Sequence, residues 1–261
     1  MVIPLYDENP LKWPVPPFVT WGLIAVNLLV FLVVSANSDS DVQLILDSFG
    51  AIPSAVFHHT ATGSWCPPEL TLVTSMFLHN GWGHILGNMI YLWVFGDDIE
   101  EAIGPLRFLL FYFLSGIVAT LAYCALHPHS TTPLVGASGA IAGVLAAYLL
   151  LRPCAKVAVL LFRVVVRIRA YWVIGGWVIL QLYLSVSGAD DGVAYAAHVG
   201  GLAAGAVLFL LLRPATVDLF ECIEEPDPAV GGYWGGRGTP PPLGDDRPPS
   251  GEIAESPRQY L

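Results

Sequence analysis

The hydroxyl group of Ser138 stands in a run of small residues, Gly136-Ala137-Ser138-Gly139, that opens a long apolar segment. A serine hydroxyl is weakly nucleophilic unless a base lies within hydrogen-bond reach and donors stabilise the oxyanion that forms. Glycines beside it let another backbone approach, but small residues also mark tight contacts between membrane helices. The run alone therefore indicates either a nucleophile or a helix contact.

Three further polar side chains lie in apolar segments far from Ser138 in sequence. His84 and Asn88 are spaced i and i+4, so a helix puts them on one face. His198 opens the last apolar segment. Each has a plainer interpretation, because polar side chains commonly bond across membrane helices and a histidine can serve a proton or ion pathway.

The composition is that of an integral membrane protein. Of 261 residues, 55% are hydrophobic and 12% charged, against about 25% charged residues in soluble proteins. The net charge of -10 argues against nucleic acid as a partner. The four cysteines are far apart and show no metal-ligand spacing, so we expect free thiols, with a Cys66 to Cys124 bridge as the alternative. No metal or cofactor is predicted.

The apolar segments predict an all-α polytopic membrane protein with six transmembrane helices. Within the second segment, the turn signal Asn80-Gly81-Trp82-Gly83 predicts that the helix proper begins near Trp82. The segments are Phe18–Val34, Leu70–Phe95, Leu106–Leu126, Leu134–Leu151, Tyr171–Val186 and Val193–Leu212.

Charge placement predicts the orientation of these spans. The loop over 35–69 holds acidic residues and no Lys or Arg, so it is expected on the outer side of the membrane. The loop over 152–169 is the densest basic cluster, so it is expected in the cytoplasm. The apolar part of this basic loop is expected to lie on the membrane surface. Both termini are then cytoplasmic. The chain divides into an N-terminal segment 1–16, a membrane domain 17–213 and a disordered Pro/Gly/acidic tail 214–261.

With this orientation, the second, fourth and sixth spans all run from the outside inward. At 1.5 Å per residue, Ser138 lies about 6 Å and His198 about 8 Å inside the starts of their helices. His198 is then placed to act as general base to Ser138, without an Asp to orient it. The Ser138 amide near a helix N-terminus, together with Asn88 and His84, predicts an oxyanion hole.

Glycines predict how the serine and histidine helices meet. Gly201 and Gly205 follow His198 at i+3 and i+7 and make a smooth helix face. That face can pack against Gly136, Gly139 and Gly143 of the fourth span.

These linked motifs resemble the rhomboid family of intramembrane serine proteases, of the bacterial six-helix type. The resemblance covers roughly 18–212 and rests on His79-x4-His84-x3-Asn88, Gly136-Ala137-Ser138-Gly139, and Ala197-His198-x-Gly200-Gly201 with Gly205. The segment 101–108 also resembles a stretch that the family carries between its second and third spans.

The resemblance implies a rhomboid-like bundle and a serine-type endopeptidase with Ser138 as nucleophile and His198 as base. His84, Asn88 and the Ser138 amide would form the oxyanion hole, and His79 a structural residue. Substrates would be single-pass or other transmembrane proteins, cleaved in or near their membrane segments. The expected location is a bacterial inner (plasma) membrane, with the active site facing outward.

Two positions depart from that family pattern. Ala142 stands where several relatives carry an aromatic residue that stacks on the catalytic histidine, and Trp65 is followed by Cys66 rather than Arg. Trp177 and Gln181 are spaced to line a lateral gate towards the second span, or to pack in the core.

The competing functions are a catalytically inactive relative that binds or escorts membrane helices, and a transporter.

Overall fold

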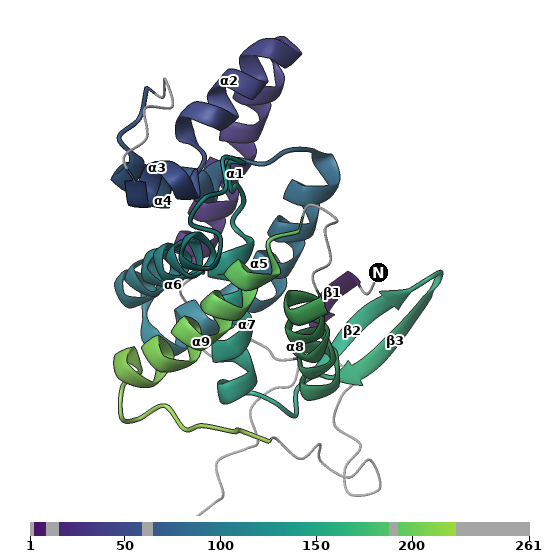
Figure 1. The fold of residues 1–261 in the computed structure, drawn as a ribbon. Coiled ribbons are helices and arrows are strands. Elements are labelled where there is room, and N and C mark those ends of the chain that lie inside the picture. The colour runs from purple at the N-terminus through teal and green to yellow at the C-terminus, as the bar shows by residue number, and fades with distance from the viewer. Residues whose placement is uncertain (1–2, 9–15, 59–64, 188–192, 223–261) are drawn as a thin grey trace, which may run out of the picture. The chain divides into compact units, whose positions relative to one another are not determined.

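Six long helices form the core of the computed structural model, which describes residues 3–8, 16–58, 65–187 and 193–222 (Figure 1). Each predicted span overlaps one of them, so the predicted fold class is confirmed. These helices are α1 (Phe18–Ser35), α5 (Trp82–Ile103), α6 (Pro105–Leu126), α7 (Ser138–Leu151), α8 (Ala170–Ser187) and α9 (Tyr195–Leu212).

Four of the helices, α1, α6, α8 and α9, are long and apolar enough to cross a membrane by length and composition. The apolar α7 is shorter, with 14 residues, and α5 ends in an acidic stretch. Together these segments make the chain an integral multi-pass membrane protein.

The helix that carries Ser138 starts later than the sequence predicted. Residues 134–137 precede it as a loop in which the amide of Gly136 donates to the carbonyl of Ser75 at 2.9 Å. Gly136 has φ +121°, a conformation that glycine adopts freely and that interrupts a helix. Ser138 is therefore the first residue of α7 rather than a residue one turn inside it. By contrast, α5 begins at Trp82 as predicted.

Short helices lie in the predicted outer loop over 35–69 and in the first part of the predicted second span. Ser38 caps the first of them by accepting a hydrogen bond from the amide of Asp41. The elements are α2 (Asp39–Phe49), α3 (Pro53–His58), α4 (Pro68–Thr74) and the 3-10 turn η1 (Ser75–Phe77).

The centre of the bundle is α7, with α5, α6 and α9 around it (Figure 1). Every residue from Gly139 to Tyr148 is buried, including the large ring of Tyr148. The small residues along α7 let α6 and α9 approach closely, because their backbones are not held apart by side chains. The most buried helix thus carries Ser138 at its N-terminal end.

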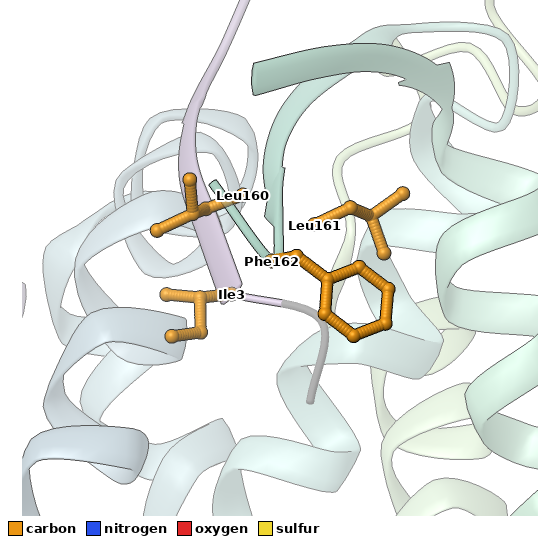
Figure 2. Close-up of a pocket in the computed structure, with 4 residues that line it drawn as sticks. All are labelled: Ile3, Leu160, Leu161 and Phe162. Carbon is orange, nitrogen blue, oxygen red and sulfur yellow. The ribbon is translucent and has the colours of Figure 1, made fainter. Parts of the chain in front are cut away.

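A three-stranded antiparallel sheet was not predicted. It has the order β1-β2-β3, with β1 (Ile3–Asp7) from the N-terminal segment and the hairpin β2 (Lys156–Leu161) and β3 (Val164–Arg169) from the basic loop. Ile3, Leu160, Leu161 and Phe162 line a cavity of about 180 Å³ where β1 meets the end of β2 (Figure 2).

A buried charge cluster lies at the C-terminal end of α7. Arg152 forms ion pairs with Asp98, with Glu101 at 3.9 Å and with Glu221 at 3.6 Å. Its side chain is only 7% exposed. Arg152 is therefore a buried partner of acidic groups, although the sequence predicted it as one charge of a basic cytoplasmic loop.

The first residues of the predicted tail lie against the same helix end. The amides of Phe220 and Glu221 donate to the carbonyls of Leu150 and Leu151 at 2.8 and 2.9 Å. A disulfide joins Cys154 to Cys222. The expectation of free cysteines is wrong for this pair, because the folded chain brings together two positions 68 residues apart. Cys66 and Cys124 are buried and form no bridge with each other. Residues 223–261 lie outside the described part of the chain.

Candidate active site

Ser138 and His198 face each other between α7 and α9. The Nε2 atom of His198 lies 2.9 Å from the Oγ atom of Ser138, which is hydrogen-bond distance for a nucleophile and its base. His198 stands in the first turn of α9 and is 8% exposed. The two residues, 60 positions apart in sequence, are thus arranged for proton transfer from the hydroxyl to the imidazole.

Glycine contacts between α7 and α9 hold this pair together. A Cβ atom at Gly201 would overlap the carbonyl oxygen of Gly139 and lie 2.9 Å from its carbonyl carbon. One turn further along, a Cβ at Gly205 would overlap the backbone of Gly143. Gly201 and Gly205 therefore pack as the sequence predicted, directly against the helix that begins with the serine.

The backbone of Ser138 adds a donor to the site. Its amide belongs to the first turn of α7, where N–H groups have no partner within the helix and carry partial positive charge. An oxyanion formed next to the serine would be stabilised at such a helix end.

The polar side chains of α5 reach the same loop. A Cβ atom at Gly136 would lie 2.6 Å from Nε2 of His84 and 3.7 Å from Nδ2 of Asn88. Glycine at position 136 thus leaves room for the His84 ring. Both side chains therefore lie next to Gly136, two residues before Ser138, at the N-terminal end of α7.

Asn88 is better arranged than His84 to donate to an oxyanion. The Asn88 amide donates one N–H to Nε2 of His79 at 3.0 Å, and its nitrogen carries a second hydrogen. His84 contacts Oδ1 of Asn80 through Nδ1 at 2.8 Å, so its Nε2 atom donates only when the ring holds both protons. His79 is buried and acts as the acceptor that orients Asn88.

Aromatic rings from α8 and α9 surround the His198 imidazole. The Trp177 ring centroid is 5.7 Å and the Tyr195 centroid 6.4 Å from that of His198. Ala142 is fully buried and supplies no ring. The aromatic contact to the histidine that is absent at position 142 is therefore made by Trp177 and Tyr195, which are distant from Ala142 in sequence.

A side-chain partner of His198 was not identified from sequence. Oε1 of Gln181, in α8, lies 2.7 Å from Nδ1 of His198. From sequence, Gln181 was expected only to line a gate or to pack in the core. A polar residue inside an otherwise apolar span was the available signal, since such a residue requires a partner.

The helical bundle makes this chain a polytopic membrane protein, and it brings a serine hydroxyl and a histidine ring within hydrogen-bond distance. The sequence matches the Rhomboid domain over residues 68–215. It is 31% identical to the rhomboid protease AarA of Providencia stuartii over 72% of this chain and 70% of that protein. The chain therefore belongs to the rhomboid family.

Two other relatives match over smaller parts of their length. The rhomboid protease GluP of Bacillus subtilis is 35% identical over 51% of this chain and 24% of its own length. The mitochondrial RHOMBOID-like protein 12 of Arabidopsis thaliana is 29% identical over 55% of this chain and 46% of its own. The chain thus spans between a quarter and a half of these two proteins.

Replacing Asn88 by alanine is expected to lower kcat of any hydrolysis at Ser138 about 100-fold, because the Asn88 amide lies where it can donate to an oxyanion. KM should change little, since the donor acts mainly on the transition state. Steady-state cleavage of a transmembrane substrate by purified protein measures both. Asn37→Ala, at an exposed amide beyond the end of α1, is the matched control. An unchanged kcat in Asn88→Ala contradicts the assignment.

Proposed function

We propose that this rhomboid-family protein is an intramembrane serine endopeptidase that hydrolyses peptide bonds in or near transmembrane segments of other proteins. The observation that carries the proposal is the 2.9 Å contact between Ser138 Oγ and His198 Nε2 at the N-terminus of a buried helix. A purely packing role for Ser138 would not need a histidine aimed at its hydroxyl.

The reaction follows from this geometry. His198 takes the proton of Ser138 while Oγ attacks the carbonyl carbon of the substrate, and the negative charge develops on the carbonyl oxygen. The Ser138 amide and Asn88 are the donors for that charge, and the His84 ring lies beside them. His198 then protonates the leaving amine. In the second half of the reaction, His198 takes a proton from a water molecule, which attacks the acyl group and releases it from Ser138.

The substrate segment must be unwound before it can react. In a helix each carbonyl is hydrogen-bonded to an amide one turn on, so it is not available to Ser138. Glycine and other weak helix formers lower the cost of unwinding. Single-pass or other transmembrane proteins with such residues near the membrane surface are therefore the proposed substrates.

The proposed orientation places the active site towards the outer side. The loop over 35–69, which holds no Lys or Arg, precedes α5 and leads to the end of the bundle where α5, α7 and α9 begin. Both termini are then cytoplasmic, as expected for a protein of a bacterial inner membrane. Water would reach Ser138 from the outer face.

Labelling and cleavage together test the proposal. Purified protein in mild detergent is treated with a fluorophosphonate probe and, separately, with a single-pass substrate. Wild type is expected to label at Ser138 and to cleave, while Ser138→Ala and His198→Ala do neither. Intact substrates and no label on a folded wild-type protein would favour an inactive rhomboid relative that binds membrane helices.

A further inference from the structure

Gln181 is a buried amide in α8, the least buried of the four candidate membrane spans among the described residues. Its side chain is 5% exposed, whereas only 17% of the α8 window is buried. A polar group in an apolar span is costly unless it is hydrogen-bonded. Its partner is Nδ1 of His198 at 2.7 Å, so the one buried polar side chain of α8 among the described residues is directed at the proposed base.

The chemistry of this contact assigns the proton on the imidazole. A carbonyl oxygen only accepts hydrogen bonds, so Nδ1 of His198 must donate to Oε1 of Gln181. A neutral imidazole carries one N–H, and Nε2 is then the unprotonated nitrogen. Nε2 is the atom 2.9 Å from Ser138 Oγ. The amide of Gln181 therefore selects the tautomer in which His198 can act as a base.

We propose that Gln181 is a positioning residue that orients His198, so that the site works as a Ser–His–Gln arrangement rather than as an unsupported pair. This rests on the proposed protease function. Gln181 fixes the imidazole tautomer and ring plane and stabilises the imidazolium that forms when Ser138 is deprotonated. It occupies the place of the acidic residue in a Ser-His-Asp triad, with a dipole instead of a charge.

Trp177 supports the same ring from the same helix. It lies one turn before Gln181, and its ring plane is tilted by 35° from that of His198. The imidazole thus contacts Ser138 at Nε2, Gln181 at Nδ1 and the tilted indole ring of Trp177. Two of these three contacts come from α8, so displacement of α8 would release the base.

Two substitutions at position 181 test the role of the acceptor. Gln181→Met keeps the length of the side chain without a carbonyl oxygen, whereas Gln181→Glu keeps an acceptor. Gln181→Met is expected to lower kcat and the rate of fluorophosphonate labelling of Ser138 about 10- to 100-fold, with KM unchanged, because a buried N–H loses its acceptor. Gln181→Glu is expected to stay within about 5-fold of wild type at neutral pH.

The pH profile separates positioning from mere packing. A carboxylate at position 181 stabilises the imidazolium of His198 more than an amide does. The acidic limb of kcat/KM should therefore move to higher pH in Gln181→Glu, since the base form of His198 is lost sooner as the pH falls. A residue that only fills space would leave this limb in place.

Tyr183→Leu provides the control, because Tyr183 lies two residues along α8 and is 64% exposed. It should leave labelling, kcat and the pH profile unchanged. The proposal is overturned if folded Gln181→Met labels at the wild-type rate, or if folded Gln181→Glu is as impaired as Gln181→Met with an unshifted profile. If Gln181→Met does not fold, the Gln181→Glu profile decides. Failure of the protease proposal itself would appear differently, as a wild type that neither cleaves nor labels.

Discussion

A valine at position 201 is expected to abolish cleavage. Even the first side-chain carbon there would overlap the backbone of Gly139, which cannot move aside as a flexible side chain could. The helices α7 and α9 would have to separate, and with them Ser138 and His198. A displacement of about 1 Å in a catalytic pair costs about 100-fold in rate, and overpacking destabilises the fold by about 1–3 kcal/mol in addition.

Single-methyl variants make the test sharper. Gly201→Ala adds one carbon at the same backbone contact, while Gly22→Ala adds it on α1 where nothing lies within 4 Å. Glycine to alanine in an open helix position stabilises by about 0.5–1 kcal/mol. We expect Gly22→Ala to keep full activity and Gly201→Ala to lose both activity and thermal stability. Full activity in Gly201→Val would contradict the packing of α9 on α7.

Loss of Arg152 is expected to be the most destabilising charge change in the described chain. Arg152→Met removes the partner of Asp98, which is 1% exposed. Breaking a buried ion pair costs about 3–5 kcal/mol, because the remaining charge stays buried without compensation. Unfolding of the purified protein by heat or denaturant in mild detergent should show a large fall in stability relative to wild type. Arg163→Met, at the exposed hairpin tip, is the matched control.

An additional substitution, of Asp98, tests whether the buried carboxylate causes this loss of stability. Arg152→Met combined with Asp98→Asn removes the uncompensated carboxylate, so stability should recover by at least about 1 kcal/mol relative to Arg152→Met alone. Glu101 and Glu221 still face position 152, and recovery is therefore partial. Equal stability of Arg152→Met and wild type would show that the cluster is not held by this arginine.

The bundle could be predicted from sequence because its signals are local. Length and apolarity of a contiguous segment decide whether it suits a bilayer, and the glycine turn before Trp82 marked the start of α5 correctly. The start of α7 was misplaced because the loop over 134–137 is as apolar as the helix that follows it. Gly136 at φ +121°, its hydrogen bond to Ser75 and the pairing of Leu134 with Ala51 keep this loop out of the helix.

The strands of the basic loop had no comparable signal. The strand that pairs with β2 on the side away from β3 is β1, which lies in the first residues of the chain, far from β2 in sequence. A short apolar run with basic residues is equally typical of a membrane-surface segment. The disulfide was missed for the same reason, since spacing alone does not tell which of four cysteines meet.

The sequence by itself determined the class of protein and the membrane segments, and it predicted Ser138, His198, His84 and Asn88 as site residues, because residue type and helical period are properties of each segment alone. The tertiary structure decided which groups touch His198. Gln181 and Trp177 reach it from α8, and Arg152 became a buried ion-pair partner, through contacts between segments distant in sequence. Such contacts depend on how neighbouring helices pack, and no single segment carries that information.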